Sequence, residues 1–127
     1  MMRSFVSNGV VWGVVRLPAG DPRLFADGVE RLATTDPVTR TISINDAVVP
    51  PLLDKVVLHE VAHAITMSWG LLPDLRKALE THEQTALEEW GAQLVENHAI
   101  EAIMASNSIL GRPVCVRGDC IYGLGDD

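Results

Sequence analysis

Apolar and polar positions along this chain form patterns that predict a small sheet in its first third. Residues 5–17 are rich in valine and contain an Asn-Gly pair, which is typical of a β-hairpin. Residues 41–45, Thr-Ile-Ser-Ile-Asn, alternate polar and apolar side chains as a half-buried strand does. From Leu24 to Leu32 apolar residues recur at helix-like spacing, so we expect a short helix there.

Two long helices are predicted in the rest of the chain. The first covers residues 52–69, because Pro51 suits a helix start and Gly70 suits a helix end. The second covers residues 84–106, and two overlapping capping-box patterns mark its start, Thr81-x-x-Gln84 and Thr85-x-x-Glu88. A helical turn at 73–79 and a strand or hairpin at 114–122 complete the prediction.

The length of the chain and the order of its elements predict the fold class. At 127 residues the chain has the size of one domain, residues 1–127. We therefore expect an α+β fold in which a small β-sheet precedes the first long helix and the second long helix packs across it.

The first long helix contains a candidate metal site. Residues 56–65 read Val-Val-Leu-His-Glu-Val-Ala-His-Ala-Ile, an HExxH motif in which every other position is apolar. His59 and His63 stand four residues apart, so they project from one helical face within reach of one metal ion. Glu60 is placed to act as the general base toward a metal-bound water. A helix that is apolar on all sides is normally buried, and buried charges need a partner, so Zn²⁺ is the expected cofactor.

A catalytic zinc site needs a third protein ligand besides the two histidines. Thr66 and Trp69 occupy the positions where the HExxHxxGxxH pattern has glycine and histidine, so the third ligand is expected to be a carboxylate near or on the second long helix. The candidates are Glu80, Glu83, Glu88, Glu89 and Glu96.

Local roles separate these candidates. Glu80 and Glu83 lie near the expected helix start, where acidic residues occur for dipole reasons alone. Glu88 is explained as the capping-box partner of Thr85. Glu89 has no such role and shares a helical face with the small residue Ala92, so Glu89 is the predicted ligand, with Glu88 and then Glu83 as alternatives. His82 and Tyr122 are the available candidates for stabilising the oxyanion, and no sequence motif supports either of them.

Composition and charge argue against nucleic acid and membranes as partners. The formal net charge is −7 and no basic stripe is present, which argues against nucleic acid. No segment approaches the ~20 apolar residues of a membrane span, and we expect a cytoplasmic protein. Cys115 and Cys120 are the only cysteines, and in a reducing cytoplasm they would be free thiols. If they lie opposite each other on a hairpin, they could form a disulfide in an oxidising environment. The sequence leaves the oligomeric state open.

Three segments resemble the ImmA/IrrE-like zincin metallopeptidases, especially the short forms of bacteriophages and prophages: residues 42–45, 59–63 and 88–92. The resemblance covers about residues 40–100. It implies a minimal zincin-like fold, in which a Glu three residues before a small residue completes the zinc site, as Glu89 stands before Ala92. After Ala92, Gln-Leu-Val-Glu replaces the family's usual Asn-x-Phe-Ala run.

Two functions follow from this interpretation. The first is a zinc metallopeptidase that hydrolyses a peptide or protein substrate, with Glu60 as general base and the strand at 41–45, if it lies at the sheet edge, aligning an extended peptide. The alternative is a non-catalytic phage or prophage structural or interaction protein that retains a zincin fold.

Overall fold

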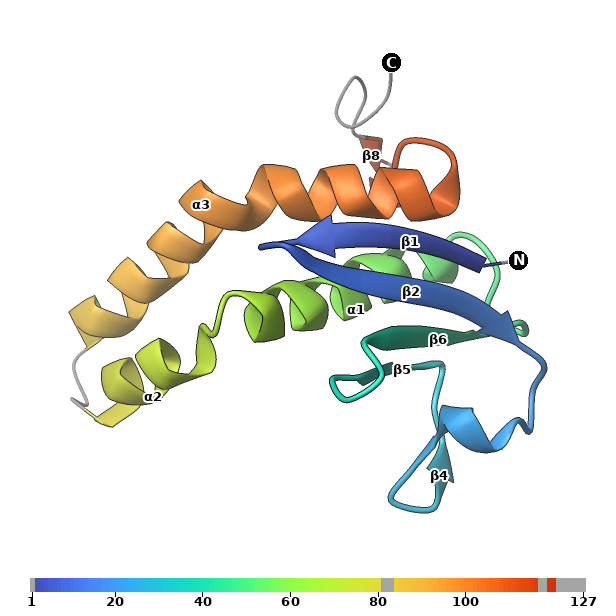
Figure 1. Cartoon of the computed structure of the whole chain (residues 1–127). Helices are drawn as coiled ribbons and strands as arrows, with labels where there is room; N and C mark the ends of the chain where they lie inside the picture. Colours follow the sequence, from blue (N-terminus) through green and yellow to red (C-terminus); the bar gives the residue numbers. More distant parts are fainter. Residues whose placement is uncertain (1, 81–83, 117–118, 121–127) are drawn as a thin grey trace.

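A four-stranded mixed sheet and three helices make up most of this α+β protein (Figure 1). The computed structural model describes residues 2–80, 84–116 and 119–120. The strand order is β1-β2-β6-β5, in which β2 and β6 run parallel and the two outer pairs are antiparallel. The strands are β1 Met2–Ser7, β2 Val10–Leu17, β5 Ala33–Asp36 and β6 Thr41–Asn45.

The predicted hairpin and the predicted strand are both confirmed. Asn8 and Gly9 connect β1 to β2 with positive φ angles of 48° and 74°, the conformation that makes Asn-Gly a favoured hairpin turn. The strand Thr41–Asn45 lies inside the sheet, between β2 and β5, so it is not the edge strand that could take a peptide. Ala33–Asp36 occupies that edge instead.

The short helix expected between Leu24 and Leu32 is wrong. Residues Pro22–Leu24 form one turn of 3-10 helix, η1, and a small hairpin follows it. That hairpin pairs β3 (Phe25–Ala26) with β4 (Val29–Glu30) through Asp27 and Gly28, whose φ angles are 53° and 75°. An Asp-Gly pair is itself a strong two-residue turn signal, and here it outweighs the helix-like spacing of the apolar residues.

The long helices form where the sequence predicts them. Helix α1 covers Leu52–Ser68 and ends as expected at Gly70, whose φ is 62°. Beyond that end, the amide of Leu71 donates to the carbonyl of Thr66 at 3.0 Å, as in a glycine-terminated helix. Helix α2 covers Leu72–Glu80 and α3 covers Gln84–Leu110. Among the described helices, none combines the length and the apolar character needed to cross a membrane.

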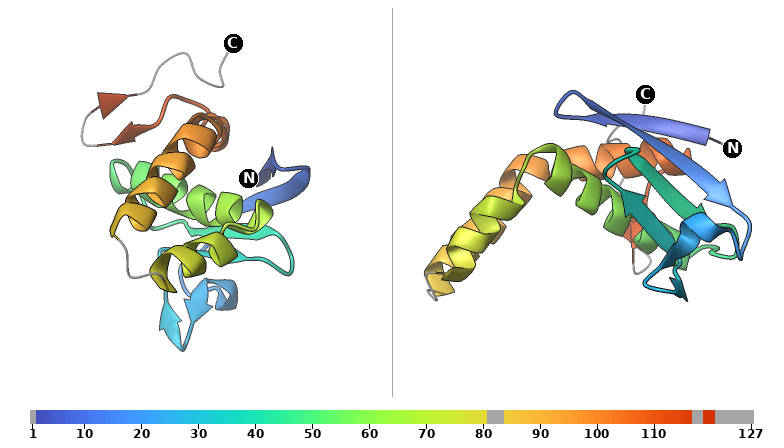
Figure 2. Two further views of the ribbon diagram at one scale, coloured as in Figure 1. Left: turned by 90° about the vertical axis from the view of Figure 1, so that its left-hand side faces the viewer. Right: turned by 60° about the horizontal axis from the view of Figure 1, so that its bottom comes forward.

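Helices α1 and α3 pack on the same face of the sheet, α1 under the inner strands and the C-terminal half of α3 along β1 (Figures 1 and 2). Burial of this apolar surface is the main stabilising contribution to the fold. α2 and the N-terminal half of α3 extend away from the sheet as a helical arm (Figure 1). The core residues are Phe5, Trp12, Val14, Ile42 and Ile44 from the sheet, Val57, Val61, Ala64 and Ile65 from α1, and Ala105 from α3.

An ion pair between the buried carboxylate of Asp54 and the half-buried Arg112 anchors the C-terminal segment to α1. Asp54 has 2% of its side chain exposed and accepts two hydrogen bonds of 2.6 Å from Arg112 and one of 2.8 Å from the Cys115 amide. The hydrogen bonds from Arg112 hold the pKa of Asp54 below its ordinary value. Beyond this anchor, β7 (Cys115–Val116) pairs with β8 (Asp119–Cys120), which confirms the predicted hairpin. Cys115 is disulfide-bonded and Cys120 is its register partner on β8.

Candidate metal centre

The two histidines of the HExxH motif lie side by side on α1. The Nε2 atoms of His59 and His63 are 3.1 Å apart, and the rings meet edge to face at 77° with centroids 4.8 Å apart. Two nitrogen ligands of a tetrahedral zinc ion, each bonded at 2.0–2.1 Å, lie about 3.3 Å apart. The pair therefore fits two adjacent positions of a zinc coordination shell.

The histidines are exposed, which contradicts the prediction that α1 is buried on all sides. The sheet and α3 cover one side of the helix, where Val57, Val61 and Ala64 are almost fully buried. His59 and His63 lie on the uncovered side and face solvent. A two-layer arrangement leaves one face of α1 without a covering layer, so both imidazoles are accessible from solvent.

Glu60 is buried and held by the edge strand. Its side chain is turned toward β5, where the Thr35 Oγ1 donates a hydrogen bond to Oε2 of Glu60, and 8% of the residue is exposed. A carboxylate that accepts this bond has a fixed orientation beside the histidines. Among the described residues, Thr35 bonds to Oε2 of Glu60, and Oε1 can accept a hydrogen bond from a water molecule.

Two open clefts flank Glu60, and both are bounded by the segment that leads into β5. The first, the His59 cleft, has a volume of about 440 Å³ and lies between residues 31–33 and the α1 residues Lys55, Val56, His59 and Glu60. The second, the His63 cleft, has a volume of about 330 Å³ and is lined by Arg31, Thr35, Glu60 and His63 among others. Arg31, Ala33 and Glu60 border both clefts, so the carboxylate stands at their junction.

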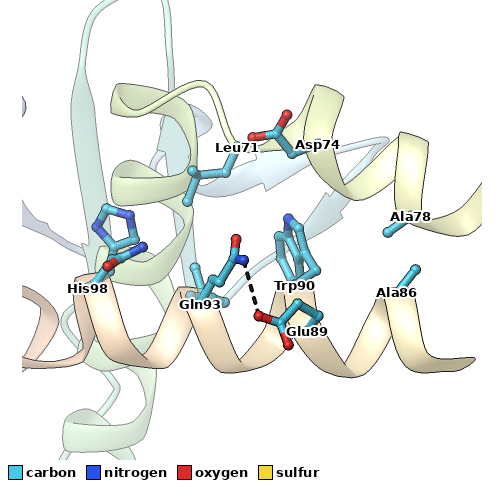
Figure 3. Close-up of a pocket in the computed structure, with 10 residues that line it drawn as sticks. Leu71, Asp74, Ala78, Ala86, Glu89, Trp90, Gln93 and His98 are labelled. Atoms are coloured by element: carbon cyan, nitrogen blue, oxygen red, sulfur yellow. Dashed lines mark hydrogen bonds between the residues drawn. The ribbon is translucent and has the colours of Figure 1, made fainter.

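The third predicted ligand, Glu89, lies in a different part of the molecule. It lines a cavity of about 420 Å³ between α2 and α3, together with Asp74, Trp90 and His98 (Figure 3). There its Oε1 accepts a hydrogen bond of 3.3 Å from Gln93 (Figure 3). Across residues 2–80, 84–116 and 119–120, no three His, Cys, Asp or Glu side chains are grouped to hold a metal ion. The assignment of Glu89 stays a prediction.

The structure also removes two arguments that separated Glu89 from its alternatives. Thr85 lies inside α3, whose described part begins at Gln84. Thr85 therefore does not cap the helix, and the expected capping-box pair of Thr85 with Glu88 does not form. Glu88 instead accepts a hydrogen bond of 3.1 Å from Gln84. Ala92 is exposed, whereas α3 reaches the α1 core through Ala102 and Ala105. Glu88 thus regains its place as a candidate.

The remaining residues that the sequence offered as ligands, oxyanion stabilisers or caps are exposed or lie outside the described part of the chain. Glu80 and Glu96 are exposed on α2 and α3. His82, Glu83, Tyr122 and the capping residue Thr81 lie outside the described residues.

Sequence reasoning missed three side chains that the fold brings to the HExxH motif. Lys55 precedes His59 by one helical turn, and this spacing was a usable signal. Thr35 and Arg31 lie 25 and 29 positions before Glu60, so only the pairing of β5 with β6 and its packing against α1 places them there.

Searches against protein-family models, curated proteins and solved structures find no match to this chain. The site is therefore interpreted from its own residues.

Proposed function

We propose that this protein is a zinc-dependent metallopeptidase. The observation that carries the proposal is the arrangement of His59, Glu60 and His63: two adjacent imidazole nitrogens 3.1 Å apart on an open helical face, next to a buried and oriented carboxylate. This is the constellation that HExxH metallopeptidases use to hydrolyse peptide bonds.

In the proposed reaction His59 and His63 would hold the metal and a carboxylate would supply the third ligand. Glu89 stays the predicted residue and Glu88 the alternative, although the structure places Glu89 at the cavity between α2 and α3. Bound zinc would act as a Lewis acid that lowers the pKa of a water molecule and polarises the scissile carbonyl. Glu60 takes a proton from the attacking water and delivers it to the leaving amine. The hydrogen bond from Thr35 would hold the Glu60 carboxylate in one orientation during both transfers.

The substrate is an extended peptide that lies along β5. This strand is the last in the sheet, and its neighbour β6 uses only one of its two edges. A peptide that adds to the free edge forms backbone hydrogen bonds and passes next to Glu60, because Thr35 of β5 contacts that residue. The edge strand β5 replaces Thr41–Asn45 in this role.

The test compares wild type with Glu60→Gln. Purified protein is loaded with Zn²⁺, its metal content is measured by elemental analysis, and cleavage of a proteome-derived peptide mixture is followed by mass spectrometry. We expect bound zinc in both proteins and cleavage that falls by about 10²–10⁴-fold in the variant, because a general base contributes about that much. Equal cleavage by both proteins, or zinc that remains after His59 and His63 are both replaced by Ala, contradicts the proposal.

One observation favours the non-catalytic alternative, in which the zincin-like protein acts by binding a partner. It is the lack of a third metal-ligating side chain near the two histidines among the described residues. This alternative expects the Glu60→Gln variant to support the protein's biological role as fully as wild type does.

A further inference from the structure

Two cationic side chains line the His59 cleft from opposite sides. Arg31 comes from the segment between β4 and β5, and Lys55 comes from the first turns of α1. Both residues are exposed, and within the described part of the chain no carboxylate forms an ion pair with either of them. The whole protein carries a net charge of −7, but the charged residues that line this cleft are two cations and one carboxylate, that of Glu60. The cleft is therefore more positive than the protein as a whole.

The helical spacing relates these charges to the histidines. Lys55, His59 and His63 follow one another at intervals of four residues, so they share one face of α1. Four residues of α-helix advance by about 6 Å, and an extended peptide advances by about 3.3 Å per residue. For a peptide that runs parallel to α1, a group bound beside Lys55 is therefore about two residues from a bond over His59 and about four residues from a bond over His63.

Arg31 is placed to act from the other wall. Its backbone is fixed, because its amide donates a hydrogen bond of 2.8 Å to the carbonyl of Leu24, and its side chain borders both clefts. A guanidinium presents paired donors that match the two oxygens of a carboxylate, and an ammonium adds a point charge.

We propose that Arg31 and Lys55 bind a carboxylate of the peptide substrate, about two to four residues from the scissile bond. The carboxylate is that of an Asp or Glu side chain or that of a free C-terminus. This inference deepens the proposed function and rests on it for the bond that is cut, but the binding itself requires no hydrolysis.

The experiment measures binding on Glu60→Gln protein, so that peptides are retained rather than cut. Immobilised protein is incubated with a random heptapeptide library bearing free C-termini and, separately, with the same library amidated. Retained peptides are sequenced by mass spectrometry. Arg31→Gln and Lys55→Gln are added to this background, with Arg31→Lys as a charge-conserving variant. Arg76→Gln and Lys77→Gln, exposed positions on α2, are the matched controls.

We expect peptides with a carboxylate to be retained at least about tenfold better than their neutral counterparts, the equivalent of one charge-assisted hydrogen bond. Arg31→Gln and Lys55→Gln reduce this preference, whereas Arg31→Lys retains part of it and both α2 controls retain all of it. Loss of the preference on amidation assigns a terminal carboxylate, and its persistence with Asp or Glu enrichment assigns a side chain.

Retention that is indifferent to carboxylates, or a preference that survives both Arg31→Gln and Lys55→Gln, overturns the inference. The two proposals fail separately. Zinc-dependent cleavage in wild type that is equally fast for neutral and for carboxylate-bearing peptides, and that Arg31→Gln leaves unchanged for both, overturns the carboxylate site alone, whereas carboxylate-selective binding without any zinc or cleavage overturns the peptidase alone.

Discussion

Thr35 of the edge strand β5 donates a hydrogen bond from its hydroxyl to Oε2 of Glu60, the carboxylate between the two histidines of α1. This contact joins the strand that would hold a peptide to the side chain that would move its protons. In the proposed mechanism, β5 would therefore both position the substrate and orient the general base.

Removal of this contact is expected to reduce catalysis without loss of metal. Thr35→Val keeps the shape of the side chain and deletes the donor, so Glu60 loses a hydrogen bond of the charge-assisted kind, which contributes about 1.5–3 kcal/mol. We expect kcat to fall by about tenfold or more at unchanged zinc content. Thr34→Val is the matched control, because the Thr34 hydroxyl donates instead to the carbonyl of Arg23. Equal rates for Thr35→Val and wild type would show that Thr35 does not position Glu60.

The third zinc ligand is assigned by comparing two neighbouring glutamates. Structural zinc sites bind with about 10–16 kcal/mol over four ligands, or roughly 3 kcal/mol for each. Glu89→Gln is therefore expected to weaken zinc binding by at least about 100-fold, as measured by competition with a chromogenic chelator. Glu88→Gln is the control and leaves the affinity near that of wild type. The reverse result assigns Glu88, and no effect of either variant rules out both residues.

The Asp54–Arg112 pair predicts a stability that depends on pH. Because the pKa of Asp54 is lowered in the folded protein, the stabilisation is fully present above the unfolded-state pKa near 3.9 and is lost as the pH falls through the folded-state value. Asp54→Asn is expected to lower the free energy of unfolding by about 1–3 kcal/mol at pH 7, because it removes the negative charge and replaces one of the two buried oxygens that accept hydrogen bonds from Arg112 and Cys115 with an NH2 donor. Urea titrations at several pH values measure this difference.

The control for this prediction is Asp46→Asn. Asp46 pairs with Arg16 at 3.2 Å, but its side chain is 57% exposed, and exposed pairs contribute only about 0–1 kcal/mol. A gap between wild type and Asp54→Asn that stays constant below pH 4 would contradict the assigned role of the ionised Asp54.

The packing of α1 against the sheet is tested by shortening one core side chain of α1, that of Val61. Val61 is fully buried beside Ile42 and Ile44, so Val61→Ala removes packed methyl groups and leaves a cavity. We expect a loss of about 1.5–3 kcal/mol in the free energy of unfolding, measured by urea denaturation. Val38→Ala, at a position that is 88% exposed, is expected to change it by less than about 0.5 kcal/mol. Similar losses for both variants would contradict the described core.

Short sequence motifs predicted correctly those turns and helix ends whose backbone geometry depends only on residues adjacent in the sequence. The Asn8-Gly9 turn, the end of α1 at Gly70 and the C-terminal hairpin are all set by the backbone preferences of a few adjacent residues. The error between Leu24 and Leu32 came from apolar spacing that two short strands satisfied as well as a helix would have done.

The sequence by itself determined that His59 and His63 share one face of a helix with Lys55, because residues four apart on an α-helix project in nearly the same direction. Only the tertiary structure decided that this face is open to solvent and that β5 rather than β6 is the edge strand. It also decided that Thr35 bonds to Glu60 and that Arg31 lines the same clefts as Glu60. These relations depend on how the strands pair and which side of α1 the layers cover, and long-range packing sets both.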